Sequence, residues 1–271
     1  MDTEILIQQL KTKDFAVFGT GFVAGMFYEA LKETGLSSGL TCCIVSKAGE
    51  GETFHGRPVY SAGSFRLPND MMLCIAVHES AFGEISDKIK SISERCVWVY
   101  PNLYELLYGI PAQPPHDIVL ADLLSKQSRD EYWLALRYAA IRDYLKNEPC
   151  YRETKDLYIK LLALHCSNAT AVRRSMQMEK LAVSMAHEGF RNDCPIAVDE
   201  RGRIIDGLHR TACAAFLHIS KIPAVIYPES KVYDRLLGKK NRLPEDVLTE
   251  AGVTASEMQF LINAMDEMLE R

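Results

Sequence analysis

Apolar runs and helical stretches alternate along residues 1–112 of the chain. Residues 15–18 form an unbroken apolar run, which predicts a buried strand, and residues 22–33 repeat apolar side chains at helical spacing. Strict alternation of strand and helix predicts an α/β domain, with a parallel sheet and helices on its faces. The other expected elements are an opening helix, strands at 41–45, 58–60, 71–77 and 96–100, and a helix at 79–93.

The clearest linker lies at residues 110–116, which contain three prolines. We therefore expect the first domain to end at residue 112. Residues 113–164 are almost wholly helical in pattern, apart from an interruption at Pro149, and predict a helical connector that packs the two halves together.

The pattern changes again beyond the connector. Residues 165–230 mix short strands and helices and predict a smaller α+β domain, whereas residues 231–271 predict a helical, acidic C-terminal tail. Within the α+β domain we expect a helix from residue 184, strands at 195–198, 203–205 and 222–226, and a helix at 211–216.

Composition narrows the class of protein. A chain of 271 residues, 48% of them hydrophobic, is long enough for two domains. Its net charge of -5 argues against nucleic acid or anionic lipid as the main partner, since both attract cationic surfaces. The longest apolar runs are far shorter than the roughly 20 residues that span a bilayer. The acidic N-terminus does not resemble a secretory signal.

Eight cysteines are scattered through apolar surroundings without a C-x-x-C pair. This spacing indicates neither a zinc site nor a disulfide scaffold. We therefore interpret the cysteines as reduced core residues and expect a cytoplasmic protein.

The run Gly19-Thr20-Gly21 begins a G-x-G-x-x-A motif between the first strand and its helix. Glycines at this corner let the backbone approach a pyrophosphate at the helix N-terminus. The segment resembles the Rossmann-like domains that precede catalytic domains in sugar-modifying enzymes, although the second strand ends at Lys47 without the acidic residue of dinucleotide sites. Gly19 and Gly21 therefore either bind a nucleotide or nucleotide-sugar, or only permit close packing of helix and sheet.

A second corner, Asp206-Gly207-Leu208-His209-Arg210, links a predicted strand to a predicted helix. Free backbone N–H groups, the helix dipole and a guanidinium at such a corner can bind phosphate. Alternatively, Asp206 and Arg210 form a local ion pair and His209 is a polar cap.

Residues 168–226 resemble the ParB/sulfiredoxin superfamily. Asn168 and Arg173 keep the spacing of its N-P-x-Q-P-R box without the prolines, and residues 202–210 match its signature turn. Sulfiredoxins place a catalytic cysteine where this chain has Leu208. The DNA-partitioning branch carries G-E-R-R and a following helix-turn-helix domain, neither of which is found here.

The free serine kinases of this superfamily carry D-G-H-H-R, which differs from this chain only at Leu208. The resemblance implies that Asp206 activates the acceptor hydroxyl or holds Mg²⁺. It also implies that His209 and Arg210 bind the transferred phosphate. Glu179 is the candidate for the upstream base, which is otherwise missing. The resemblance further implies nucleotide contacts from Gly207, Thr211 and Arg173.

The sequence therefore predicts a nucleotide-dependent phosphotransferase that acts on a small hydroxylated metabolite, such as an amino acid or sugar derivative. Its expected ligands are ATP or ADP, with CTP as an alternative, together with Mg²⁺. The other hypothesis is a ParB-like nucleotide-gated switch without kinase activity. The oligomeric state stays open, with a homodimer among the alternatives.

Overall fold

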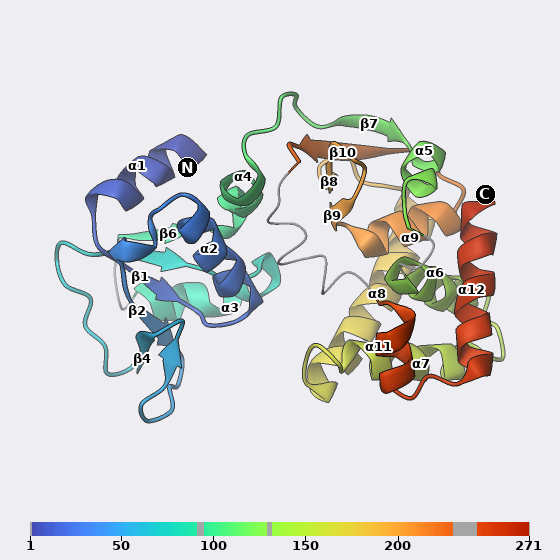
Figure 1. Ribbon diagram of the computed structural model, residues 1–271, viewed down its shortest axis with the longest axis horizontal. Coiled ribbons are helices and arrows are strands. Elements are labelled where there is room, and N and C mark those ends of the chain that lie inside the picture. The colour runs from blue at the N-terminus through green and yellow to red at the C-terminus, as the bar shows by residue number, and fades with distance from the viewer. Residues whose placement is uncertain (1, 91–94, 129–131, 230–242, 271) are drawn as a thin grey trace. The chain divides into compact units, whose positions relative to one another are not determined.

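A computed structural model describes residues 2–90, 95–128, 132–229 and 243–270 (Figure 1). The chain divides into two compact units, Met1–Ile110 and Pro111–Arg271. The end of the expected helix at 79–93 and the first part of the expected tail, residues 231–242, lie outside the described residues.

The first unit contains a six-stranded, mostly parallel sheet with the order β3-β4-β2-β1-β5-β6. Only the pairing of β3 with β4 is antiparallel. The parallel sheet expected from the alternating pattern is confirmed. Its strands are β1 (Phe15–Phe18), β2 (Leu40–Val45), β3 (Thr53–Phe54), β4 (Arg57–Ser61), β5 (Met72–Ile75) and β6 (Cys96–Trp98).

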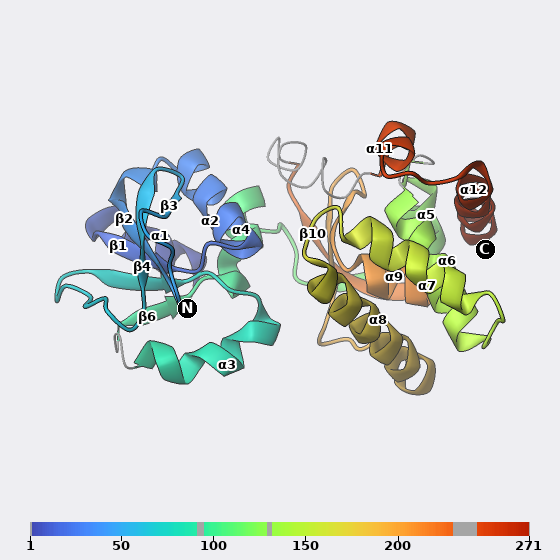
Figure 2. The same cartoon turned by 90° about the horizontal axis from the view of Figure 1, so that it is seen from below.

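Helices cover both faces of this sheet, with α2 and α4 on one side and α3 on the other (Figure 2). All four residues of β1 are buried, as are those of β5, because each of these strands has neighbours on both edges and helices on both faces. The helices are α1 (Thr3–Thr12), α2 (Phe22–Glu33), α3 (Glu79–Lys90) and α4 (Leu103–Tyr108), with short 3-10 turns at Ser37–Gly39 and Tyr100–Asn102.

The second unit contains a four-stranded mixed sheet with the order β7-β10-β8-β9. Its first strand, β7 (His116–Val119), pairs antiparallel with β10 (Lys221–Tyr227), so the expected linker is shorter than residues 110–116. β10 continues parallel to β8 (Ile196–Asp199), which pairs antiparallel with β9 (Ile204–Asp206).

The helices of the expected connector, residues 113–164, belong to the second unit and contribute to its core. Residues 132–141 of α6 (Tyr132–Leu145) are all buried, because this helix is apolar around its whole circumference and needs partners on every side. α6 packs between α9 and α7 and also contacts α8 and α12 (Figure 1). The other helices are α5 (Leu120–Ser125), α7 (Tyr151–Leu162), α8 (Asn168–Glu188), α9 (Leu208–Phe216), α11 (Glu245–Glu250) and α12 (Ala255–Leu269).

The C-terminal helix is also part of this core. Leu261, Met265 and Met268 of α12 are buried in the same cluster as the apolar residues of α6 and α9. Across the described ranges, no helix is both long enough and apolar enough to cross a lipid bilayer.

Candidate functional site

The turn between β8 and β9 is fixed by a buried carboxylate. Asp199 accepts hydrogen bonds from the backbone N–H groups of Arg201 and Arg203 at 3.1 and 2.8 Å, and its other oxygen pairs with Arg203 Nε at 2.6 Å. These bonds satisfy a carboxylate that is almost fully buried. The strand that leads to residue 206 therefore starts from a well-defined turn.

Gly207 forms the corner between β9 and α9. Its φ is +101°, and an added Cβ would lie 2.5 Å from Cγ2 of Ile196 on the neighbouring strand. Only glycine tolerates both the conformation and this close approach. The corner expected from sequence is present, and α9 begins at Leu208 rather than near residue 211.

The first turn of α9 offers unpaired backbone donors. The first turn of an α-helix has no intrahelical acceptor for its N–H groups, and no side chain caps this helix. Thr211 is the first residue whose N–H bonds back, to the carbonyl of Gly207 at 2.8 Å. In the described chain, the N–H groups of residues 208–210 donate no hydrogen bond, so this turn can bind an anion.

Asp206 and Arg210 lie on one side of this corner as an ion pair. Arg210 Nη2 is 3.1 Å from Asp206 Oδ2, and Arg210 Nη1 donates to the carbonyls of Cys194 and Pro195. The local ion pair weighed as an alternative from the sequence is therefore formed. Arg210 ties the segment before β8 to α9, whereas Asp206 keeps 45% of its side chain exposed and its Oδ1 without a partner in the described chain.

His209 points to a different side, because successive helical residues are about 100° apart. Its Nε2 lies 2.6 Å from the hydroxyl of Tyr158 and accepts from Arg137 Nε at 3.3 Å. An arginine can only donate, so the ring proton belongs on Nδ1. Burial, followed by the charges of Arg137, Arg174 and Arg210, lowers the pKa of His209 well below its usual 6.5. The imidazole is therefore neutral at physiological pH.

Arg137 is a buried cation at the centre of this second side. Only 9% of the residue is exposed, its Nη1 donates to the carbonyl of Trp133 at 2.9 Å, and its guanidinium carbon lies 4.9 Å from the centre of that indole. Burial is the largest effect on its pKa, which is lowered. No carboxylate pairs with Arg137 among the residues that the structure describes.

Arg174 adds a second cation to this group. Its positive charge acts to lower the pKa of Arg137, Tyr158 and His209. We call Arg137, Tyr158, Arg174 and His209 the arginine cluster. Its members come from α6, α7, α8 and α9.

The other predicted residues of this unit, Glu179, Arg173 and Thr211, have no described hydrogen bond to the side chains of Asp206, His209 or Arg210. Glu179 pairs with Lys155 at 2.5 Å and accepts from the Tyr151 hydroxyl, both on α7. Arg173 is exposed on α8. Thr211 is fully buried, and its hydroxyl has no hydrogen-bond partner among the described residues.

The two glycines predicted to bind a nucleotide in the first unit differ in their surroundings: Gly19 is closely packed, and the space around Gly21 is open. Gly19 has a φ of +116°, and an added Cβ would lie 2.8 Å from the carbonyl oxygen of Ala76, so close packing requires this glycine. Gly21 precedes α2, and nothing lies within 4 Å of its Cβ position. These glycines follow the carboxyl end of β1. Trp98 and Tyr100, whose rings are 6.0 Å apart, lie at the carboxyl end of β6.

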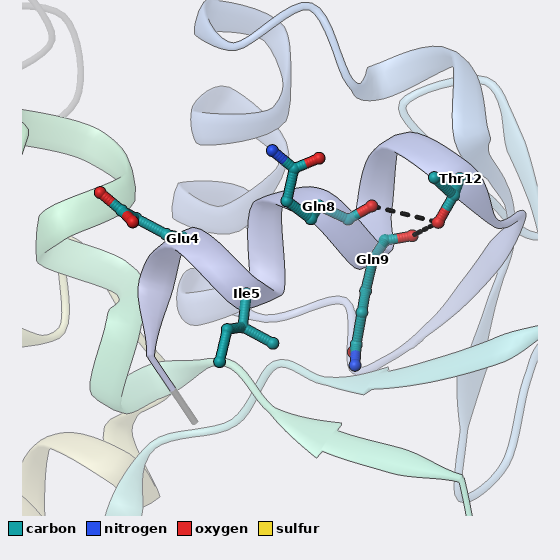
Figure 3. A pocket seen from close by; sticks show the side chains of 5 residues that line it. All are labelled: Glu4, Ile5, Gln8, Gln9 and Thr12. Atoms are coloured by element: carbon teal, nitrogen blue, oxygen red, sulfur yellow. Dashed lines mark hydrogen bonds between the residues drawn. The ribbon is translucent and has the colours of Figure 1, made fainter.

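Two surface hollows lie away from these sites. The one on α1 has a volume of about 430 Å³ and is lined by a single helix, with Ile5, Gln8 and Gln9 spread along it (Figure 3). The other, of about 610 Å³, lies along α8 and contains Glu179, Met176 and Lys180. Neither brings together residues of the corner or of the arginine cluster.

A divalent cation would have one protein ligand at the corner. Nowhere in the described ranges do three or more His, Cys, Asp or Glu side chains gather as a metal site. Mg²⁺ commonly binds through one or two carboxylates together with phosphate oxygens and water. The exposed Oδ1 of Asp206 fits that requirement.

Comparisons with models of known families, with curated proteins and with solved structures found no match to this chain. Function must therefore be argued from the geometry of the corner and of the arginine cluster. Arg137 and Tyr158 were not predicted from the sequence, and Arg174 was given no separate role. A lone arginine within the otherwise apolar stretch 132–141 was the available signal.

Proposed function

We propose that the second unit binds the phosphates of a nucleotide at the start of α9 and transfers one to a small hydroxylated metabolite. One observation carries this proposal: the free N–H groups of residues 208–210 lie at a glycine corner, at the start of a helix that no side chain caps. Such a corner attracts phosphate, because the free donors and the helix dipole both favour negative charge. The D-G-x-H-R resemblance to free serine kinases supports the same assignment.

Each residue of the corner has a role in this proposal. The N–H groups bind phosphate oxygens, and Gly207 supplies the positive φ and the close contact with Ile196 that place this turn against the sheet. Asp206 would hold Mg²⁺, which when bound neutralises charge on the phosphates. His209 presents Nδ1–H as a neutral donor, and Arg210 is a positioning residue that fixes the segment before β8.

For the first unit we propose a Rossmann-like domain. Its strand order reverses between β1 and β5, and the loop after β1 carries Gly19 and Gly21 at that reversal. Doubly wound sheets bind ligands at such a point, beyond the carboxyl ends of the strands. This unit would bind a nucleotide-sugar or part of the substrate.

A phosphate-transfer assay tests the proposal. The protein is incubated with Mg²⁺ and ATP labelled on its γ-phosphate, together with pools of hydroxylated amino acids and sugar derivatives. We expect label to appear in a small molecule. Failure of ATP, ADP and CTP to bind in calorimetry would overturn the proposal.

A nucleotide-gated switch without transfer is the second candidate. It is favoured by the position of Glu179, the expected base, which is held by Lys155 and Tyr151 and contacts neither Asp206 nor His209 in any described interaction. Under this alternative, ATP or CTP is at most hydrolysed, and no labelled metabolite forms.

A further inference from the structure

Arg137 lacks the counter-charge that its burial requires. The residue is nine-tenths buried, and its two assigned hydrogen bonds go to neutral acceptors, the Trp133 carbonyl and Nε2 of His209. A buried cation is costly unless an anion or several hydrogen bonds compensate for lost hydration. Its third nitrogen, Nη2, makes no hydrogen bond within the described chain.

The neighbours of Arg137 add positive charge rather than removing it. Arg174 is partly exposed on α8, forms no ion pair or hydrogen bond with described residues, and its charge acts on three members of the arginine cluster. The Tyr158 hydroxyl donates its proton to His209 Nε2 and adds no negative charge. Two guanidinium groups without a carboxylate favour an oxyanion as ligand.

This site differs from the place proposed for the nucleotide. Asp206 and Arg210 lie on one side of the first turn of α9, and His209 connects the other side to α6 and α7. A Mg²⁺-bound polyphosphate belongs on the side of Asp206. The arginine cluster is therefore free to take a second ligand next to it.

We propose that Arg137 and Arg174 bind the anionic group of the acceptor, a carboxylate or phosphate. This inference rests on the proposed phosphotransfer and narrows its substrate to hydroxylated metabolites that carry a negative charge. His209 lies between the two ligands and positions Arg137.

The test uses calorimetry on the full chain saturated with MgADP, with malonate and inorganic phosphate as separate probes. We expect one of the two to bind to the wild type, and its identity distinguishes a carboxylate from a phosphate. Arg174→Gln should weaken that binding at least about tenfold, the usual effect of losing one charged hydrogen bond. Lys180→Gln, which removes an exposed cation from the same helix, is the matched control and should leave it unchanged.

MgADP affinity is measured for the same variants. We expect Arg174→Gln to change it by less than about threefold. If MgADP affinity falls together with anion affinity, the cluster belongs to the nucleotide and the inference is wrong. Equal effects of Arg174→Gln and Lys180→Gln, or no anion binding at tens of millimolar, would also overturn it.

Two further controls complete the design. Tyr158→Phe removes one hydroxyl, whose proton is donated to His209 Nε2, without changing the shape of the core, and should leave anion binding within about threefold. Anion binding measured without nucleotide separates the two proposals. If MgADP does not bind but the anion does, with the same dependence on Arg174, the proposed phosphotransfer fails and the oxyanion site stands.

Discussion

Arg137 Nε donates to His209 Nε2 over 3.3 Å, and this contact joins the buried central helix α6 to the first turn of α9. The bond fixes the imidazole in its neutral Nδ1–H form and leaves the arginine without a counter-ion among the described residues. The first turn of α9 is thereby bordered by positive charge on a different side from that of Asp206.

The depressed pKa of His209 predicts how stability depends on pH. The unfolded chain takes up a proton below about 6.5, whereas the folded state resists it, because burial and Arg137, Arg174 and Arg210 disfavour the imidazolium. The other titratable group that contacts the imidazole is the Tyr158 hydroxyl. The stability that neutral His209 contributes is therefore fully present above about pH 6.5 and is lost as the pH falls toward the folded-state pKa.

His209→Gln should remove this dependence. The difference in free energy of unfolding between wild type and variant should shrink as the pH is lowered from about 7.5 to about 5. Urea denaturation at several pH values measures it, with the exposed His187→Gln as control. A difference that stays constant over this range would show that His209 titrates normally.

Gly207→Ala should destabilise the second unit by at least about 2 kcal/mol, since the new Cβ meets Ile196 and the residue keeps a positive φ. Gly189→Ala is the matched control. It also has a positive φ, +77°, but open space around its Cβ position, so about 1 kcal/mol is expected. Chemical denaturation compares the two, and equal losses would contradict the close packing at the corner.

Much of the first unit could be predicted from local pattern, because β1, β2 and β5 are short apolar runs and a helical repeat follows β1 and β5. β7 was missed since its four residues are mostly exposed and follow three prolines. The packing partners of α6 could not be predicted either. The apolar sequence of this helix shows that it must be buried, but it does not identify the helices that pack against it.

In the candidate site, too, local features could be predicted from the sequence and tertiary contacts could not. The corner at Gly207 is visible in sequence because its residues are consecutive. Arg137, Tyr158 and Arg174 belong to three helices and meet only through the packing of α6, α7 and α8. Their grouping depends on tertiary contacts that no local spacing encodes.

Asp206→Asn should weaken MgADP binding about tenfold and change it little when Mg²⁺ is chelated, because the carboxylate is needed for the cation. Stability should change by less than about 0.5 kcal/mol, since its ion pair with Arg210 is part-exposed. Asp193→Asn, which breaks an exposed pair with Arg191, is the control. Calorimetry with and without chelator checks this, and equal losses in both conditions would exclude Asp206 as the ligand.

Glu179→Gln should alter turnover by less than about threefold and lower stability by about 1 kcal/mol, because the carboxylate supports α7 through Lys155 and Tyr151. Steady-state rates and thermal unfolding measure the two effects, with the exposed Glu188→Gln as control. A loss of turnover by orders of magnitude at unchanged stability would identify Glu179 as the base after all.

Backbone amide NMR during a titration with MgADP tests the central claim most directly. The account predicts that the largest chemical-shift changes fall on the amides of Leu208, His209 and Arg210, whose N–H groups are free at the start of α9. Unchanged signals from these three amides in the saturated protein, with the changes at Gly21 and Phe22 instead, would contradict it.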